Sequence, residues 1–331
     1  MNEALRGLLK QTSRSFHLTL RVLPGAVRPQ IGLAYLLART TDTIADSEII
    51  PVEQRLRALQ QLRERILGQR SPLLDFSEIA SRQGDPAERL LLEKCDLSLA
   101  QLRELSSDDL DRTREVLKTI ISGQELDLQR FASASFESIT ALKNEAELDD
   151  YTYRVAGCVG EFWTKLCRAH LFPKAELDEA RLFEEAVRFG KGLQLVNILR
   201  DLPADLRKGR CYLPEDKLAQ GGLKPADLLQ PMSQGKFAPI YHRHLDSAEA
   251  HLAAGWKYTN TIPRGQVRVR LACAWPILIG LETIRRLRQE NVLDPKLRVK
   301  ISRADVRQII LRSVLWYPSA RAWRRLARMP A

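Results

Sequence analysis

The sequence predicts an all-α protein, and three observations lead to that class. Apolar residues recur at helical spacing along almost the whole chain, and no stretch alternates as a half-buried strand would. The breaks between these stretches carry turn residues, such as Phe172-Pro173 and Gly221-Gly222. No internal repeat or low-complexity linker divides the chain. We therefore predict a single helical domain over residues 1–331, with a basic C-terminal tail from about residue 312.

The periodicity predicts a helix in each of nine segments. These segments are residues 25–46, 52–68, 86–104, 108–132, 149–171, 176–202, 236–260, 265–290 and 303–316. Aromatic residues are spread along the whole chain, as one continuous helical core requires.

Composition indicates a soluble, cytoplasmic protein. Hydrophobic residues make up 44% and charged residues 28% of the chain, which excludes disordered and fibrous proteins. The five cysteines are odd in number and contain no C-x-x-C pair, which favours reduced thiols over disulfides or zinc. The longest uncharged apolar run, residues 271–281, is too short to span a bilayer.

The positive charge is concentrated in the last fifth of the chain. Residues 264–331 hold 16 Lys and Arg against four Asp and Glu, whereas the remainder is nearly neutral. Trp316, Tyr317 and Trp323 lie among these basic residues, a mixture suited to a lipid headgroup interface. We expect peripheral attachment at the inner membrane face, or a phosphate-bearing ligand. The alternative is a solvated basic helix face with a frayed tail.

Two helical segments carry a stripe of polar residues in apolar surroundings. In the first, Tyr35, Arg39, Asp42 and Asp46 recur at helical spacing. The second contains Gln194, Asn197, Asp201 and Asp205 at similar spacing, but Pro203 predicts a kink or restart of the helix near Leu202.

The matching stripes predict a metal site. We expect the two stripes to face each other across a cavity. Carboxylates one turn apart lie about 6 Å from each other, and their repulsion is roughly 3 kcal/mol at an effective dielectric of ~20. A divalent cation relieves this cost, and Mg²⁺ prefers carboxylate, water and phosphate oxygens. The alternative for a single aspartate pair is a solvated helix face.

Further basic and small residues accompany these stripes. Arg210 follows the second stripe, and Arg14 lies beside Ser13 near the N-terminus, so both arginines offer guanidinium groups suited to phosphate. Gly157 and Gly160 lie within a predicted helix after Tyr151. Glycine weakens a helix, which indicates either close packing or the wall of a roomy tunnel.

Taken together, these motifs resemble the squalene/phytoene synthase family, the head-to-head prenyl transferases. The resemblance extends from about Ser13 to Arg303. It rests on five motifs in the family's order: Ser13-Arg14-Ser15-Phe16, the Tyr35–Asp46 stripe, Tyr151 with Gly157 and Gly160, the Asn197–Arg200–Asp201–Asp205 stripe, and Arg210. It implies a single-domain isoprenoid synthase fold with a central hydrophobic cavity.

The resemblance also implies a reaction. Two farnesyl diphosphates would condense through presqualene diphosphate, and NADPH would reduce the product to squalene. Asp42, Asp46, Asp201 and Asp205 would bind Mg²⁺. The substrate-binding residues would be Ser13, Arg14, Arg39, Gln194, Asn197, Arg200 and Arg210. Phe16, Tyr35 and Tyr151 would stabilise carbocations, with a tyrosine hydroxyl acting as acid or base.

The NADPH contacts are expected in the segment 297–303. Lys300 and Arg303 would bind the extra phosphate, and Asn197 would hold the nicotinamide or a metal-bound oxygen; plain surface charge is the alternative for the two cations. The motifs are most like those of a bacterial squalene synthase, although Thr152 stands where a cysteine is common and Ala45 replaces a frequent acidic residue.

Two alternatives stay open. A phytoene or dehydrosqualene synthase would share the fold and first half-reaction but use no hydride. A non-catalytic basic protein that binds membrane or nucleic acid is the other, but no nucleic-acid-binding signature occurs in the sequence, so we expect no nucleic-acid partner.

Overall fold

The computed structural model describes residues 3–13, 16–69, 75–294 and 298–327. Contacts divide the chain into two compact units. Unit 1 comprises Met1–Ala132 and Phe162–Ala175, and unit 2 comprises Ser133–Glu161 and Glu176–Ala331. Among the described residues, no helix is both long and apolar enough to cross a membrane. The cysteines are all free and buried.

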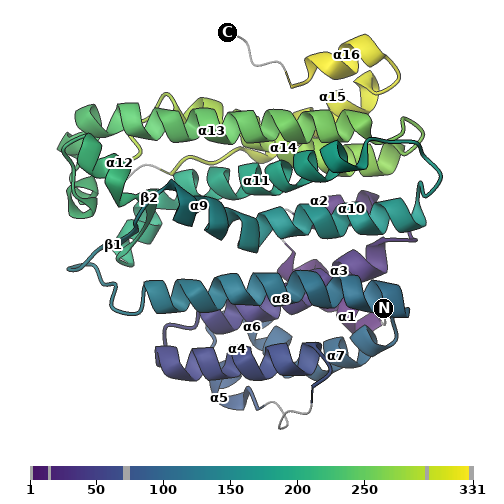
Figure 1. Ribbon diagram of the computed structural model, residues 1–331, viewed down its shortest axis with the longest axis horizontal. Helices are drawn as coiled ribbons and strands as arrows, with labels where there is room; N and C mark the ends of the chain where they lie inside the picture. The colour runs from purple at the N-terminus through teal and green to yellow at the C-terminus, as the bar shows by residue number, and fades with distance from the viewer. Residues whose placement is uncertain (1–2, 14–15, 70–74, 295–297, 328–331) are drawn as a thin grey trace. The chain divides into compact units, whose positions relative to one another are not determined.

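Unit 1 is built from helices. They are α1 (Glu3–Thr12), α2 (Phe16–Val22), α3 (Arg28–Ala45), α4 (Val52–Ile66), α5 (Ser77–Ser81), α6 (Pro86–Glu93), α7 (Cys95–Arg103), α8 (Ser107–Arg130) and the greater part of α10 (Cys158–His170). Helix α8 packs against both α3 and α4 (Figure 1). The buried Asp109 of α8 accepts hydrogen bonds from Gln30 of α3 at 3.1 Å and from His170 of α10 at 2.9 Å, so a polar cluster joins three helices.

Unit 2 combines long helices with two short strands. Its elements are β1 (Thr140–Leu142), α9 (Glu145–Thr152), the π-helix η1 (Tyr153–Gly157), the start of α10, α11 (Glu179–Arg207), β2 (Arg210–Pro214), α12 (Glu215–Gln220), the 3₁₀-helices η2 (Pro225–Leu229) and η3 (Pro231–Ser233), α13 (Gln234–Thr261), α14 (Val267–Leu287), α15 (Arg303–Trp316) and α16 (Ala320–Arg325). Helices α11 and α13 lie side by side in Figure 1.

The helical class predicted from the sequence is confirmed, with two corrections. The segment 86–104 is interrupted at Lys94, where α6 ends and α7 begins. The expectation of no strands is wrong, because β1 pairs in parallel with β2, Thr140 opposite Arg210. Strands of three and five residues are too short for a period of two to be recognised.

Glycines allow two helical segments of unit 2 to approach closely. A Cβ atom on Gly160 would lie 2.1 Å from the carbonyl oxygen of Ala186 in α11, and one on Gly190 would lie 2.1 Å from that of Ala156. Of the two interpretations of Gly157 and Gly160, the structure supports close packing, since a Cβ on Gly157 would also meet Val187 at 3.3 Å. This contact fixes α11 against the segment that follows Tyr151.

Helix α11 continues through Pro203, so the predicted restart near Leu202 is wrong. Proline has no N–H, so the carbonyl of Leu199 loses its donor four residues later. The fully buried hydroxyl of Tyr241, in α13, donates to this carbonyl at 2.9 Å instead. A side chain from the neighbouring helix thus replaces the missing backbone donor and lets Asp201 and Asp205 share one uninterrupted helix.

We expect Tyr241→Phe to lower the free energy of unfolding by about 1–3 kcal/mol, because the buried Leu199 carbonyl then has no donor. Pro203→Ala restores a backbone N–H at that place. In the Pro203→Ala background, Tyr241→Phe should therefore lower the free energy of unfolding by clearly less. Urea denaturation of the four proteins in this double-mutant cycle measures the difference. An equal cost in both backgrounds would show that Tyr241 does not substitute for the missing donor.

Candidate functional site

The first aspartate pair lies at the C-terminal end of α3. Asp42 occupies the last turn and Asp46 is the residue that caps the helix, with its N–H donating to the Asp42 carbonyl at 2.8 Å. The C-terminal end of a helix carries partial negative charge, and the last turn of α3 contains no basic residue. Both the helix and the neighbouring carboxylate therefore disfavour ionisation here, and a cation would relieve both effects.

Neighbouring helices compensate the Asp42 charge only in part. The Nε2 group of Gln124, from α8, donates to the Asp42 carboxylate. Arg39 lies 3.7 Å from Asp42 but also pairs closely with Glu88 of α6. Because Arg39 is shared between two carboxylates, unit 1 holds more negative charge around this guanidinium than the guanidinium can neutralise.

Asp42 is correspondingly hard to ionise. Its surroundings raise the pKa of the Asp42 carboxyl to about 6 from an ordinary value of 3.8. Desolvation within the fold is the largest cause and the charge of Asp46 is the second, while Arg39 and Gln124 act in the opposite direction. The Asp42 side chain nevertheless keeps 46% of its surface accessible, so a dissolved cation can reach it.

The donor chemistry around Asp42 fits Mg²⁺. The Oε1 atom of Gln124 is buried without a hydrogen-bond partner, and it belongs to the side chain that contacts Asp42. Such an oxygen can accept a hydrogen bond from a water ligand of the metal. Within the described ranges, no three His, Cys, Asp or Glu side chains form a ready-made metal cage. Mg²⁺ commonly keeps several waters and binds through few carboxylates and substrate phosphates.

The second aspartate pair occupies the last two turns of α11. Arg200 forms two hydrogen bonds with the carboxylate of Asp201, at 2.9 and 2.6 Å, and both side chains remain partly accessible. Asp205 follows one turn later and is partly exposed. Asn197 is exposed, and its amide lies 3.5 Å from Gln194. The stripe predicted from the sequence is thus one accessible face of unit 2, whereas its position opposite the α3 stripe stays a prediction.

Two of the predicted aromatic residues stack on each other in unit 1. The rings of Phe16 and Tyr35 lie 4.9 Å apart at an interplanar angle of 26°, and the Tyr35 hydroxyl donates to the carbonyl of Thr12 at 3.1 Å. Ser13 is buried and its hydroxyl has no hydrogen-bond partner. Arg14, the predicted phosphate ligand, lies outside the described residues.

The third predicted aromatic has a partner that sequence reasoning missed. Tyr151 of α9 stacks on Tyr212 of β2, with ring centroids 4.7 Å apart. Arg210 begins the same strand, so β2 places a phosphate-binding candidate and this aromatic pair on one short element. Tyr151 also lies two residues before the π-helical turn η1, a feature common at functional sites.

Gln124 is the other site residue that sequence reasoning missed. It is a buried polar residue on a face of α8 shared with Ile120, Ile121 and Leu128. A polar side chain on an apolar helical stripe is the pattern that identified the aspartates, and it was present here too. A single amide in such a stripe indicates a functional site less strongly than a pair of carboxylates does, and Gln124 was therefore not predicted.

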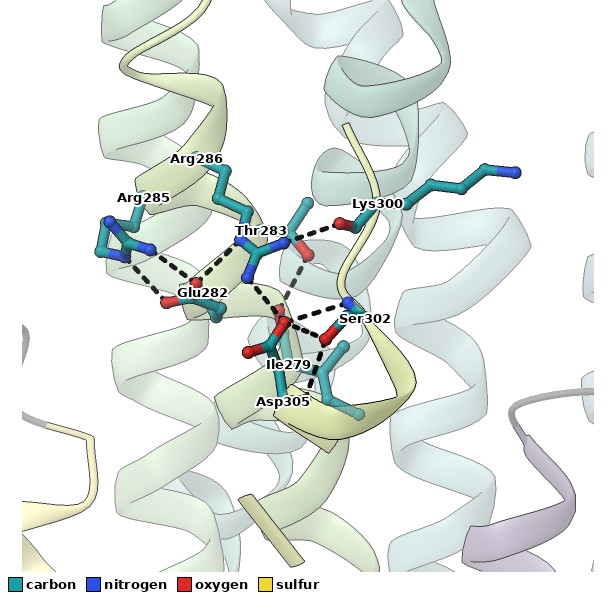
Figure 2. Close-up of polar contacts among 8 residues, drawn as sticks. All are labelled: Ile279, Glu282, Thr283, Arg285, Arg286, Lys300, Ser302 and Asp305. Carbon is teal, nitrogen blue, oxygen red and sulfur yellow. Dashed lines mark hydrogen bonds and ion pairs between the residues drawn. The ribbon is translucent and has the colours of Figure 1, made fainter. Parts of the chain in front are cut away.

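The predicted NADPH segment begins at residue 297, which lies outside the described residues, and its part from residue 298 onward is fixed to α14 by its backbone (Figure 2). Arg286 donates to the carbonyl of Lys300 at 2.8 Å and to Asp305 at 2.7 Å. The Lys300 side chain points away from this network and is exposed, as is Arg303 at the start of α15. Two accessible cations on a fixed segment are available to an anionic ligand.

Comparison with known proteins gives one consistent family. The squalene/phytoene synthase model matches residues 9–305. Presqualene diphosphate synthase of Rhodopseudomonas palustris is 29% identical over 300 residues, which cover 90% of this chain and 91% of that protein. A bifunctional lycopene cyclase/phytoene synthase of Colletotrichum graminicola is 32% identical over 229 residues, covering 69% of this chain but only 37% of that longer protein.

The fold is also similar to a solved structure. The squalene synthase HpnC from Alicyclobacillus acidocaldarius superposes with a TM-score of 0.62 at 18% identity, covering 87% of this chain and 93% of that one. At this identity the likeness concerns the fold alone.

We expect Asp42→Asn to change how stability depends on pH. The folded state holds the Asp42 proton up to a pKa of about 6, whereas an unfolded aspartate releases it near pH ~4, so deprotonation destabilises the fold as pH rises through this window. Without divalent metal, the variant should melt at a higher temperature than the parent at pH ~7.5, and the gap should shrink at pH ~5. Differential scanning fluorimetry in EDTA measures both temperatures.

Asp96→Asn is the matched control, because it removes an aspartate on α7 whose side chain is 67% exposed. The raised pKa would be contradicted if the difference in melting temperature between Asp42→Asn and the parent were identical at both pH values. It would also be contradicted if Asp96→Asn showed the same dependence on pH.

Proposed function

The chain belongs to the squalene/phytoene synthase family and is a prenyl transferase of isoprenoid biosynthesis, and we propose that it makes squalene from two farnesyl diphosphates. In the proposed first half-reaction, the C–O bond of one farnesyl diphosphate breaks and diphosphate leaves. The double bond of the second substrate attacks the allylic cation, and loss of a proton gives the cyclopropyl product presqualene diphosphate. In the second half-reaction, a second diphosphate leaves and hydride from NADPH reduces the rearranged cation.

The observation that carries this proposal is an aspartate pair, one turn apart, at the C-terminal end of two separate helices. Asp42 and Asp46 terminate α3, and Asp201 and Asp205 lie in the last turns of α11. Each pair would hold Mg²⁺ through its carboxylate oxygens, and the ion would neutralise the charge of a departing diphosphate. The relation to a presqualene diphosphate synthase over nine-tenths of the chain supports the same substrate class.

Arginines beside the aspartates would bind the diphosphate oxygens. Arg200 already contacts a carboxylate in two-point geometry, which is the geometry it would use for phosphate. Arg39 is partly accessible, and Arg210 starts β2 a few residues beyond Asp205. These guanidinium groups would orient the leaving group and stabilise the charge that it acquires.

The stacked aromatic pairs would face the carbocations. Phe16 with Tyr35 and Tyr151 with Tyr212 each present a π surface, which attracts positive charge without acting as a nucleophile. The hydroxyl of Tyr35 or Tyr151 would relay the proton that is lost when the cyclopropane closes to an oxygen of the departing diphosphate. Stacking restricts the orientation of each ring before the substrate binds, so the rings lose little conformational entropy during the reaction.

NADPH enters the proposal as a second substrate. Lys300 and Arg303 are exposed on the segment that Arg286 holds, and they would bind its extra phosphate, with Asn197 on the nicotinamide side. Peripheral attachment to anionic lipid also belongs to the proposal.

The product distinguishes squalene synthase from the alternatives. With purified protein, Mg²⁺ and farnesyl diphosphate, we expect squalene when NADPH is present, and presqualene diphosphate or dehydrosqualene when it is absent; mass spectrometry identifies each. Lys300→Ala combined with Arg303→Ala should impair the second half-reaction and spare the first, because those cations would contact only the nucleotide.

Lys224→Ala combined with Lys236→Ala, two exposed lysines elsewhere in unit 2, is the matched control. A product distribution that NADPH leaves unchanged would instead identify a dehydrosqualene synthase, and turnover only of geranylgeranyl diphosphate would identify a phytoene synthase.

A further inference from the structure

The C-terminal helices are firmly attached to unit 2. Trp323 of α16 is buried and stacks on Trp256 of α13 with ring centroids 5.2 Å apart. Its Nε1 atom donates to Asn260 at 2.9 Å, and the guanidinium of Arg270 lies over both the Trp323 ring and the Tyr317 ring. The frayed tail is therefore excluded for the described residues up to 327, and the expectation that Trp323 faces lipid headgroups is wrong, because this ring packs inward.

The start of α15 is held equally well, as Figure 2 shows. Ser302 and Asp305 cap the helix reciprocally, and Arg286 of α14 donates to Asp305 at 2.7 Å. Further along, Trp275 of α14 donates to the hydroxyl of Ser313 at 2.9 Å. Helix α15 therefore has a fixed orientation on α14, and the residues on its outer face are determined by the fold.

The outer face of α15 is apolar where a solvated helix would be polar. Leu311, Val314 and Leu315 recur at helical spacing with 59%, 47% and 64% of their surfaces exposed, whereas Ser313 is fully buried on the opposite side. Single exposed leucines are ordinary, but a contiguous exposed apolar stripe indicates a surface that binds something.

The surroundings of this stripe are strongly basic. Exposed arginines lie on α15 and α16: Arg303, Arg307, Arg312, Arg321, Arg324 and Arg325. From residue 298 onward the sequence contains one acidic residue, Asp305, and Arg286 pairs with it. An apolar stripe within an almost uncompensated positive field complements a partner that is negative at its surface and apolar beneath.

A cavity of about 660 Å³ lies between α14, α15 and residues 325–327. Leu278, Leu281, Ile309 and Leu326 contribute its apolar lining. Its charged lining consists of Glu282 and Asp305, which pair with Arg285 and Arg286, and of Arg312 and Arg325, which contribute positive charge. Arg312 also stacks on Trp316, 4.5 Å from the ring centre. Apolar walls combined with arginines suit an anionic amphiphile better than a simple ion.

We propose that the surface formed by α15 and α16 docks the enzyme onto an anionic phospholipid bilayer. Leu311, Val314 and Leu315 enter the boundary between headgroups and acyl chains, and the arginines bind the lipid phosphates. The cavity takes the headgroup of one lipid, with its phosphate at Arg312 and Arg325. Apart from Arg303, which is assigned to NADPH, the residues of this surface take no part in the proposed reaction, so docking is independent of which product the enzyme makes.

Co-sedimentation with vesicles tests this proposal without substrate present. The full-length protein should bind vesicles of mixed phosphatidylglycerol and phosphatidylcholine, bind pure phosphatidylcholine weakly, and lose binding as salt increases. Leu311→Gln with Leu315→Gln should weaken binding to mixed vesicles about tenfold. Arg324→Gln with Arg325→Gln should weaken it about fivefold for each arginine removed.

Matched controls come from residues 224–236, which lead into the start of α13, whereas Trp256 lies near the other end of that helix. Met232→Gln removes an apolar side chain that is 88% exposed, and Lys224→Gln with Lys236→Gln removes two exposed charges. These controls should bind as the parent does. Circular dichroism should show that all variants are folded, and turnover of dissolved farnesyl diphosphate should be unchanged, so a failure of docking is distinguishable from a failure of the proposed function.

Three results would overturn the proposal. One is equal sedimentation on neutral and mixed vesicles, and another is a loss of binding in the controls as large as that in the α15 and α16 variants. The third is retention on heparin without any vesicle binding, which would identify a soluble polyanion as the partner.

Discussion

Carboxylates one helical turn apart repel each other, and this repulsion is the constraint on which the candidate site depends. In unit 1 desolvation within the fold is the largest cause and the repulsion from Asp46 adds to it, and together they raise the pKa of Asp42 to about 6. Arg39 is shared with Glu88 and does not cancel these effects. The fold thus keeps a destabilising arrangement that a divalent cation would turn into a stabilising one.

Unit 2 meets the same constraint differently. Arg200 pairs with Asp201 through two hydrogen bonds, so much of that charge is compensated before any ligand arrives. The remaining difficulty is geometric, because Pro203, which lies between the two aspartates, has no N–H to donate to the carbonyl of Leu199. The Tyr241 hydroxyl repairs the interruption from α13, and the glycine contact at Gly190 holds α11 against η1 on another side.

Features that follow from a repeating sequence pattern could be predicted, whereas contacts between residues far apart in the sequence could not. The stripes containing Asp42 and Asp201 lie on helices at the predicted spacing, because helical periodicity is local. Gln124 could not be assigned to Asp42 from the sequence, since 82 residues separate them and only packing of α8 on α3 brings them together.

Three other features were beyond local reasoning for the same reason. The continuity of α11 depends on Tyr241, which is 42 residues from the carbonyl that it serves. Strands β1 and β2 are too short to show alternation. The direction of Trp323 depends on Trp256, in another helix, so an aromatic residue within a basic segment was read as exposed although it is buried.

The central claim is that both aspartate pairs hold the metal that removes diphosphate, and the release of inorganic diphosphate from farnesyl diphosphate tests it most directly. At saturating Mg²⁺, Asp42→Asn and Asp201→Asn should each reduce the release rate by about a hundredfold or more, while circular dichroism shows intact folds. Asp96→Asn should release diphosphate at the parent rate. Full turnover in either site variant, or equal rates for the parent in EDTA and in Mg²⁺, would contradict the account.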